Sequence, residues 1–256
     1  MKARKRFGQH FLHDPRILDR IARGIAPRAD DALVEIGPGR GALTRVLLNA
    51  NPRSLDAIEI DRDLVPRLQN EFAAEPRFAV HEADALDFDF TTLASQRGSR
   101  LRIVGNLPYN ISTPLLFRLL KHVAVIDDMH VMLQREVVNR IAAEPGNGDY
   151  GRLTVMLSPW LKAEALFEVG PGAFQPPPKV WSAVVRLTVR REPAFTVSPH
   201  FAAVVASAFS HRRKTLRNAL KGVVSAAQIE SAAVDPNARP ETIAPEAFNR
   251  LAQSLA

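Results

Sequence analysis

The sequence predicts an α/β domain with a mostly parallel sheet, followed by a small all-helical domain. First, short apolar runs alternate with segments of helical periodicity through the first half of the chain, which is typical of repeated βαβ units. Second, two later strand-like runs are separated only by a loop. Third, beyond Arg191-Glu192-Pro193 apolar residues recur only at helical spacing. We therefore expect one domain at residues 1–190 and another at residues 191–256.

The first expected helix begins after Asp14, because aspartate is a good N-cap and Pro15 suits the first helical position. Its apolar residues at helical spacing are Ile17, Leu18, Ile21 and Ile25. The expected strands of the alternating part are Ala32–Ile36, Leu55–Ile60, Phe78–Val80, Leu101–Gly105 and Met129–Leu133. The helices expected between them are Ala42–Leu48, Leu64–Phe72 and one that starts at Thr113-Pro114.

The pattern changes after this alternation. Ala165–Val169 and Ser182–Val189 predict two strands joined by the loop GPGAFQPPPKVW, and we expect them to form an antiparallel pair at the edge of the sheet. The helical part then has apolar residues at i, i+3, i+4, i+7 and i+8 from Phe201. Leu216 and Leu220 continue helically, and Pro245 starts a last helix.

The composition excludes several classes of protein. With 46% hydrophobic and 24% charged residues, the chain has enough apolar material for a core. It has no cysteine, which excludes disulfides, thiolate metal sites and cysteine nucleophiles. No apolar run approaches the roughly 18 residues of a membrane helix, and no secretory signal is present. His10 and His13 lack a supporting carboxylate cluster. We expect a cytoplasmic protein with no metal and no membrane partner, and nothing demands more than a monomer.

The net charge of +7, from 34 basic and 27 acidic residues, favours a polyanionic partner. Nucleic acid is the first candidate, and the alternative is a basic enzyme without such a partner. The basic residues gather in two clusters. The first is at the N-terminus, with Arg4, Lys5 and Arg6, and the second comprises Arg212, Arg213, Lys214, Arg217 and Lys221. Each is either a phosphate-contacting surface or a solvated face.

The glycine-rich turn VEIGPGRGAL follows the first expected strand and precedes a helix. Gly37, Gly39 and Ala42 satisfy the G-x-G-x-x-G/A pattern, in which the backbone can approach a ligand closely. Glu59 ends the second strand and can accept both hydroxyls of a ribose, and Asp84 after the third strand can accept from an adenine amino group. Parallel strands place such residues at one edge of the sheet, so these positions predict a nucleoside-binding site.

The fourth expected strand ends in IVGNLPYNIS. The Asn106 side-chain oxygen and a backbone carbonyl at Leu107 or Pro108 can hold both hydrogens of an exocyclic amino group, and Tyr109 adds an aromatic face. The adenine N6 is a poor nucleophile because its lone pair is delocalised. Two acceptors favour a pyramidal nitrogen aimed at an electrophilic methyl. The alternative is a rigid turn with a core tyrosine.

Taken together, GPGRG, Glu59, Asp84 and NLPY resemble the class I S-adenosylmethionine-dependent methyltransferases that act on adenine. More closely, the chain is similar to the ribosomal RNA adenine dimethylases, in particular those of the small subunit. The further segments that carry this resemblance are KRFGQHFL, IEIDRDL, LQREV, FQPPPKVWSAVVRL and HRRKTLRNAL. The resemblance extends over nearly the whole chain. The family implies a Rossmann-like, mostly parallel seven-stranded sheet.

The resemblance also implies roles for single residues. The positions it assigns to S-adenosylmethionine are His10, Leu12, Gly37, Gly39, Glu59, Ile60, Asp84, Ala85 and Asn106. His10 stands where the family more often has asparagine, which a backbone contact tolerates. Catalysis is assigned to Asn106-Leu107-Pro108-Tyr109, with Tyr109 and Phe174 on either side of the target adenine. Without the family, Phe174 in F-x-P-P-P-x-V is better explained as core filler in a rigid turn. The two basic clusters would bind RNA.

The favoured hypothesis is therefore N6,N6-dimethylation of two adjacent adenosines in the 3′-terminal hairpin of small-subunit rRNA, with the small ribosomal subunit as partner. Three alternatives stay open. A large-subunit rRNA adenine methylase shares the fold and the chemistry. An NAD-dependent dehydrogenase fits the glycine turn but leaves NLPY unexplained. A factor that only binds nucleic acid would not need the set Gly37, Glu59, Asp84 and Asn106.

Overall fold

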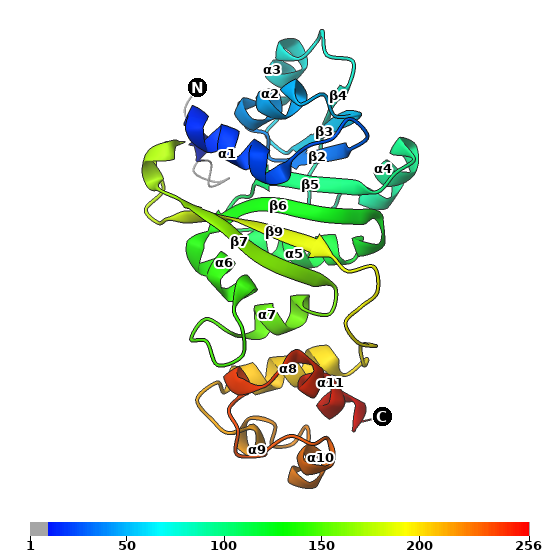
Figure 1. The fold of residues 1–256 in the computed structure, drawn as a ribbon, viewed down its shortest axis with the longest axis vertical. Coiled ribbons are helices and arrows are strands. Elements are labelled where there is room, and N and C mark those ends of the chain that lie inside the picture. The colour runs from blue at the N-terminus through cyan, green and yellow to red at the C-terminus, as the bar shows by residue number, and fades with distance from the viewer. Residues whose placement is uncertain (1–9, 256) are drawn as a thin grey trace. The chain divides into compact units, whose positions relative to one another are not determined.

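The computed structural model describes residues 10–255, and its ribbon is drawn in Figure 1. The chain forms two compact units. The first comprises the residues up to Val138 together with Glu164–Val189, and the second comprises Asn139–Ala163 together with the chain from Arg190 onwards. The chain passes from the first unit to the second for the last time after Val189, one residue before the boundary expected at 190. Asn139–Ala163, which the sequence placed in the first domain, belongs to the second unit instead.

The seven-stranded sheet has the order β4-β3-β2-β5-β6-β9-β7. Its strands are β2 (Ala32–Ile36), β3 (Ser54–Glu59), β4 (Phe78–Glu82), β5 (Leu101–Asn106), β6 (Ile126–Gln134), β7 (Leu161–Val169) and β9 (Ser182–Val189). The pairs β2–β3, β2–β5, β3–β4 and β5–β6 are parallel, whereas β9 pairs antiparallel with β6. This confirms the mostly parallel sheet, with β7 as the edge strand beside β9.

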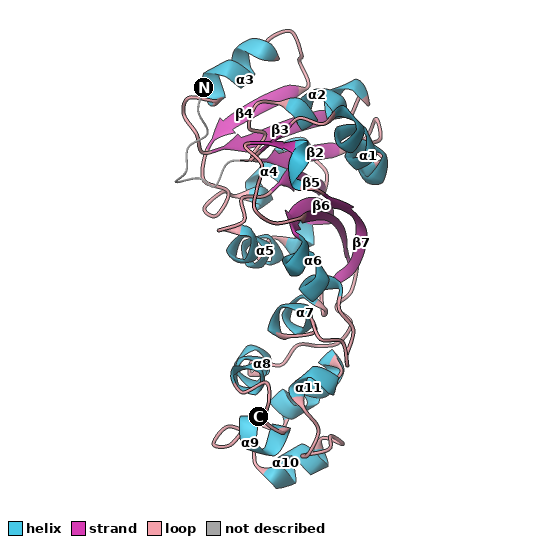
Figure 2. Cartoon of the chain, turned by 90° about the vertical axis from the view of Figure 1, so that its left-hand side faces the viewer, coloured by secondary structure: helices cyan, strands magenta, loops and turns pink. Residues whose placement is uncertain are grey.

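Helices lie on both faces of this sheet, with α1 and α2 on one side and α5 on the other in Figure 2. The helix α1 (Pro15–Ile25) precedes β2. The helices that directly follow β2 to β6 are α2 (Ala42–Asn49), α3 (Val65–Glu71), α4 (Phe90–Arg97), α5 (Ser112–Leu120) and α6 (Arg135–Ala142), with a 3₁₀ turn at Val123–Val125 before β6. Asp14 caps α1 as expected, accepting from the amides of Arg16 and Ile17 at 2.8 and 3.4 Å. The sequence pattern did not predict α4 or α6.

The core of the first unit lies where these helices meet the sheet. Every residue of β2 is buried, in keeping with a strand covered on both faces. Leu33, Leu47 and Leu55 are completely buried in one apolar cluster with Ile21 of α1. This packing fixes the carboxyl ends of the central strands, where the predicted site residues lie.

A separate two-stranded ladder joins β1 (Phe11–Leu12) to β8 (Phe174–Gln175), which follows a 3₁₀ turn at Pro171–Ala173. Phe11 pairs with Gln175 and Leu12 pairs with Phe174, antiparallel. The His13 amide extends the ladder by donating to the Ala173 carbonyl at 3.0 Å. A strand of two residues is too short to show an alternating hydrophobic pattern, so the sequence pattern did not predict this pairing.

The second unit is helical apart from the start of β7. Its helices are α7 (Arg152–Leu157), α8 (Phe201–Ser210), α9 (Leu216–Ala219), α10 (Ala226–Ser231) and α11 (Pro245–Gln253), with a 3₁₀ turn at Pro240–Thr242. Tyr150 and Val155 are buried in the same apolar cluster as Phe201 and Phe248, which explains why residues before β7 join this unit. The Tyr150 hydroxyl also donates to the Ile243 carbonyl at 2.7 Å.

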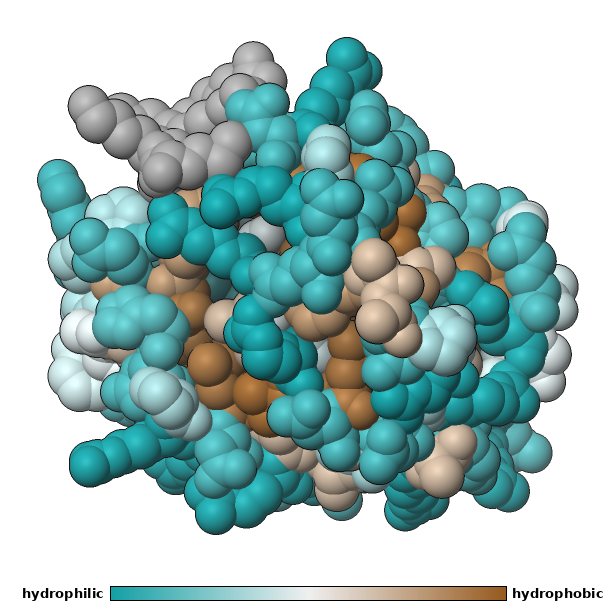
Figure 3. Space-filling view, turned by 90° about the horizontal axis from the view of Figure 1, so that it is seen from above, coloured by the Kyte–Doolittle hydropathy of each residue, from teal (hydrophilic) through white to brown (hydrophobic). Residues whose placement is uncertain are grey.

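Among the described residues, no helix combines the length and hydropathy needed to span a membrane. The face drawn in Figure 3 is mostly hydrophilic, with small apolar areas between polar side chains. Four large apolar side chains of the described chain are exposed: Ile60, Val180, Trp181 and Val223.

Candidate active site

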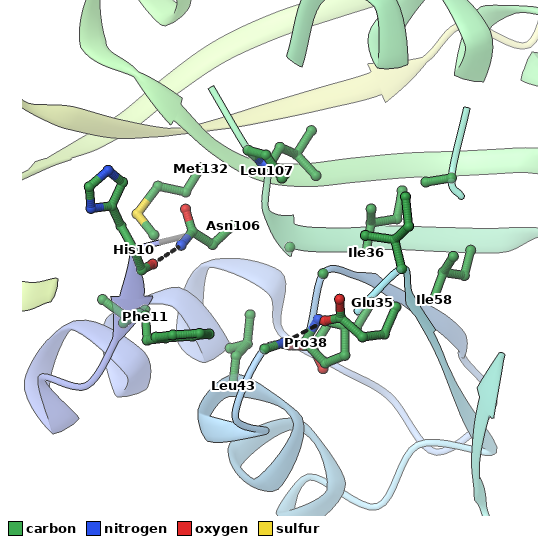
Figure 4. Close-up of a pocket in the computed structure, with 18 of the residues that line it drawn as sticks. His10, Phe11, Glu35, Ile36, Pro38, Leu43, Ile58, Asn106, Leu107 and Met132 are labelled. Carbon is green, nitrogen blue, oxygen red and sulfur yellow. Dashed lines mark hydrogen bonds between the residues drawn. The ribbon is translucent and has the colours of Figure 1, made fainter. Parts of the chain in front are cut away.

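One pocket at the carboxyl ends of β2, β3, β4 and β5 collects most of the predicted site residues (Figure 4). The predicted cofactor positions that line it are His10, Leu12, Gly37, Gly39, Glu59, Ile60, Asp84, Ala85 and Asn106. Leu107, Pro108 and Tyr109 line the same pocket. Residues from segments almost a hundred positions apart thus meet at one edge of the sheet, as the parallel topology requires.

Glu59 connects the end of β3 to the glycine turn. Its two carboxylate oxygens accept from the Gly39 amide at 3.2 Å and from the Asp61 amide at 2.9 Å. Burial raises the pKa of Glu59 above its ordinary value, although these backbone donors oppose the rise. Each carboxylate oxygen keeps a lone pair that can accept another donor. The side chain is therefore held in place as an acceptor at the pocket wall.

Two glycines permit close approach around the pocket, one of the Ile36 backbone and the other of the Phe11 ring. Gly105 at the end of β5 has φ +154°, and a Cβ there would lie 2.4 Å from the Ile36 carbonyl oxygen. Gly39 has φ +58°, and a Cβ there would lie 3.0 Å from the Phe11 ring. Neither position has room for a side chain. The glycine pattern predicts Gly39, but no sequence signal marks Gly105, because its neighbour Ile36 lies on another strand.

Glu35 is a second carboxyl group in the pocket wall, and only 2% of its surface is exposed. The Thr44 hydroxyl of α2 donates to one of its oxygens at 2.6 Å. Burial raises the pKa of Glu35 to about 7, with a smaller contribution from the negative charge of Glu59. A carboxyl group in this setting is protonated over part of the physiological pH range.

The residues predicted to contact the adenine of the cofactor are Ile60, Asp84 and Ala85, and all three line the pocket. Asp84 follows β4 and accepts from the Leu86 amide at 2.9 Å, so its side chain is fixed within a turn. Ile60 has 45% of its surface exposed, which leaves an apolar face free in a pocket wall. An aliphatic side chain beside a carboxylate acceptor suits a flat base with an amino group on its edge.

The side-chain amide of Asn106 has a defined orientation. Its Nδ2 donates to the His10 carbonyl at 3.0 Å (Figure 4). A carbonyl oxygen can only accept, so the amide nitrogen must face His10, and the Asn106 oxygen remains available as an acceptor. The Pro108 carbonyl already accepts from the Ile111 amide at 3.2 Å, which favours Leu107 as the second acceptor.

Tyr109 and His10 form one side of the pocket. Their rings are stacked with centroids 5.8 Å apart and an interplanar angle of 28°. The Tyr109 hydroxyl bonds to the Ser182 hydroxyl at 2.6 Å, and burial raises the pKa of Tyr109. The His10 Nδ1 donates to the Pro176 carbonyl at 2.8 Å. His10 is thus held through both its ring and its backbone carbonyl, and any residue type could supply the backbone contact.

Phe174 does not belong to the pocket lining. It is 1% exposed and packs in the core cluster with Leu12 and Val184. Its partner in the short ladder is Leu12, and this ladder joins the core to the segment that carries His10. In this structure Phe174 is a core residue, which is what the turn pattern alone suggests. Its role beside the target adenine stays a prediction.

The predicted RNA-binding residues of the second cluster are all exposed. They are Arg212, Arg213, Lys214, Arg217 and Lys221. Arg212, Arg213 and Lys214 lie in the turn between α8 and α9, and only Arg217 lies within a helix, so the basic cluster is not a single helical face. The Arg212 guanidinium donates to the Gly148 carbonyl. Arg4, Lys5 and Arg6 lie outside the described residues.

Several pocket residues had not been predicted, among them Phe11, Arg40 and Met132. The Arg40 guanidinium lies over the Phe11 ring at 4.5 Å from its centroid, beside the glycine turn. The Met132 carbonyl accepts from the Leu107 amide at 3.1 Å and so fixes the start of the NLPY turn. The alternation of strands predicts that β6 follows β5, but not which of its residues faces the site.

Comparisons with known proteins find relatives that match over the full chain. The model of the family described as ribosomal RNA adenine dimethylase matches residues 1–256. Ribosomal RNA small subunit methyltransferase A from Pseudomonas aeruginosa is 56% identical over 262 residues, covering 100% of this chain and 95% of the relative. The protein of the same name from Marinobacter nauticus is 52% identical, covering 100% of this chain and 92% of the relative.

Two solved structures are similar over nearly the whole chain. The 23S rRNA methyltransferase ErmE is 29% identical with a TM-score of 0.75, covering 96% of this chain and 99% of its own. A dimethyladenosine transferase from Plasmodium falciparum is 26% identical with a TM-score of 0.80, covering 94% of this chain and 96% of its own.

Proposed function

The chain belongs to the ribosomal RNA adenine dimethylase family, and on that premise we propose that it methylates N6 of two adjacent adenosines in the 3′-terminal hairpin of small-subunit rRNA. The product would be N6,N6-dimethyladenosine. The choice of the small subunit is supported by the relatives that are more than half identical, which are named for that subunit. We further propose that the substrate is an assembling small subunit in the cytoplasm and that the enzyme acts as a monomer.

The observation that carries the proposal is the orientation of the Asn106 amide. Its nitrogen is engaged by the His10 carbonyl, so its oxygen is the atom offered to a substrate. An acceptor that is fixed before the substrate arrives can hold an amino group without losing further rotamer freedom. A dehydrogenase has no use for this acceptor, which disfavours the NAD alternative.

The pocket residues fit S-adenosylmethionine, which would supply an electrophilic methyl group on a sulfonium sulfur. Glu59 would accept from the two ribose hydroxyls, because both of its oxygens are held by backbone amides and keep free lone pairs. Asp84 would accept from the adenine amino group, and Ile60 would pack on the ring. Gly37 and Gly39, both with positive φ, would give the methionine part close access to the backbone.

The chain's own residues would prepare the target nitrogen. The Asn106 oxygen and the Leu107 carbonyl would each accept one hydrogen of N6, while Tyr109 holds the ring by stacking. Held in this way, N6 would direct its lone pair at the methyl group that S-adenosylmethionine supplies. The nitrogen would lose one proton to water once the new bond has replaced the carbon–sulfur bond. The second transfer repeats the step on the monomethylated nitrogen, with one hydrogen left to hold.

The test is methyl transfer from labelled S-adenosylmethionine to under-methylated small subunits, with the modified nucleoside identified by mass spectrometry. We expect N6,N6-dimethyladenosine at two adjacent positions of the 3′-terminal hairpin. Label in large-subunit rRNA instead would favour the activity in the name of ErmE, a structural relative at 29% identity. Bound cofactor without any label would contradict the proposal and favour a factor that only binds nucleic acid.

A further inference from the structure

Trp181 is a large aromatic side chain that the proposed chemistry does not use, and 48% of its surface is exposed. We propose that Trp181 and Arg135 form a second nucleobase-binding platform that stacks a base neighbouring the target adenosine in the RNA strand. This inference rests on the proposed function, since it assigns a further contact to the same substrate.

Two contacts hold Trp181 in place, one at the edge of its ring and one at its backbone carbonyl. A Cβ built on Gly170 would lie 3.6 to 3.9 Å from three atoms of the indole six-membered ring, so this edge of the ring lies against backbone without a side chain between them. The Arg135 amide donates to the Trp181 carbonyl at 2.9 Å. A ring supported in this way loses little freedom when a base stacks on it, which is the property that stacking sites share.

The charge around Trp181 suits a nucleotide. The Arg135 guanidinium lies 5.8 Å from the indole centroid and bonds to Glu168 at 3.2 Å. Both partners of this ion pair are about half exposed, so a phosphate can compete for the arginine at little cost. Lys179 is also exposed, two residues before Trp181. An aromatic face with a cationic side chain over it, and a second exposed cation two residues away in the sequence, is the composition of single-stranded RNA sites.

The position relative to the pocket is the third argument. Trp181 directly precedes Ser182, whose hydroxyl bonds to the Tyr109 hydroxyl at 2.6 Å. Because consecutive Cα atoms are about 3.8 Å apart, the Trp181 backbone lies within about 10 Å of the Tyr109 hydroxyl. Trp181 therefore lies beside the wall that would hold the target adenine. The next nucleotide of the same strand can span this separation.

The first experiment locates the contact directly. The full chain is bound to under-methylated small subunits, irradiated with short-wavelength ultraviolet light, digested, and searched by mass spectrometry for nucleotides attached to the peptide that carries Trp181. We expect a nucleotide adjacent to the methylated adenosines. A Trp181 attached only to ribosomal protein would overturn the proposal and assign the side chain to a protein contact.

The second experiment compares Trp181→Ala with Trp181→Phe and with Val180→Ala. Val180 is the matched control, because it is 44% exposed and adjacent but has no aromatic face. Loss of one stacked base should raise KM for the small subunit about tenfold in Trp181→Ala. The kcat and the affinity for S-adenosylmethionine should stay near those of the wild type, and Trp181→Phe and Val180→Ala should stay within about threefold in KM.

An unchanged KM in Trp181→Ala would overturn the platform, and so would an equal loss in Val180→Ala. Failure of the proposed function is separate, because it appears as absent dimethyladenosine in the wild type. A wild type that methylates the hairpin, together with a Trp181→Ala variant that does so equally well at low subunit concentration, rejects only the platform.

Discussion

Asn106 is the side chain on which the proposed chemistry depends most. In Asn106→Ala the acceptor for N6 is removed together with the bond to the His10 carbonyl. We expect turnover on small subunits to fall about a hundredfold or more, the usual size for one preorganised group at a reacting centre. RNA affinity should change only modestly, because the clusters proposed to bind RNA do not include Asn106. Single-turnover methylation and filter binding would measure the two quantities, and turnover close to that of the wild type would reject this mechanism.

The raised pKa of Glu35 makes the free energy of unfolding depend on pH, and one substitution can isolate this contribution. Its pKa is about 7 in the folded protein against 4.5 for the free group, so the folded state binds more protons than the unfolded state between these values. The free energy of unfolding should therefore fall as the pH rises from 4.5 to 7, by about 3 kcal/mol from this group, and level off above 7.

The isosteric variant Glu35→Gln should lack this component, because its amide oxygen can still accept from Thr44 and it does not titrate. We expect the difference in unfolding free energy between variant and wild type to grow in favour of the variant up to pH 7. Urea unfolding at four pH values would measure it. A difference that does not change with pH would show that Glu35 ionises alike in both states.

Among the secondary-structure elements, the end of α1 is anchored by a largely buried ion network. The Arg102 guanidinium donates to the Ile25 carbonyl at 2.6 Å and pairs with Asp31 and with Asp128, the latter at 3.0 Å. These three charged side chains are 12%, 12% and 20% exposed. Burial alone would raise the pKa of Asp128, but its contacts with His130 and Arg102 lower it. Removing the arginine would leave two carboxylates without their partner in a poorly solvated place.

We therefore expect Arg102→Met to lower the free energy of unfolding by about 3–5 kcal/mol. The matched control is Arg100→Met, two residues earlier. Arg100 also donates to backbone carbonyls, but the side chains of its ion pair with Asp127 are 44% and 55% exposed. The loss in this control should be smaller, about 1–2 kcal/mol. Thermal and urea unfolding would compare the two variants. Equal losses would mean that burial does not set the strength of these pairs.

The elements that the sequence predicts are those with a long local pattern. The strands from Ala32 and from Ser182 were predicted because continuous apolar runs stand between turn residues, and the structure confirms them. In contrast, β1 and β8 have two residues each and depend on pairing between distant segments. Glu59, Asp84 and Asn106 could be predicted because each follows a strand. The orientation of Asn106 could not, because its partner carbonyl belongs to His10, 96 residues earlier.

For the molecule as a whole, the charge distribution leads to a prediction about salt. Arg212, Arg213 and Lys214 are exposed in one turn of the second unit. Replacing all three with glutamine should weaken binding to small subunits and reduce the slope of log affinity against log salt by about 0.7–0.9 for each phosphate that no longer has a cationic partner. The control replaces Arg16, Arg23 and Arg28, which are exposed in or just after α1, with the same change in net charge.

Binding measured at four salt concentrations would separate the two triple variants. The control should keep the wild-type slope, because its charges belong to a face with no proposed contact. Equal slopes in all three proteins would move the RNA surface away from the turn between α8 and α9.

The ladder between β1 and β8 also bears on how the molecule is made. The His10 ring bonds to the Pro176 carbonyl across 166 positions of sequence, and the His10 carbonyl orients Asn106. Closing so long a loop costs chain entropy, and chains are synthesised from the N-terminus. The central strands can form while the chain is emerging from the ribosome, but the wall of the pocket must wait for the segment around Phe174. A nascent chain that ends before this segment therefore holds the glycine turn and Asn106 without the bond network that aligns them.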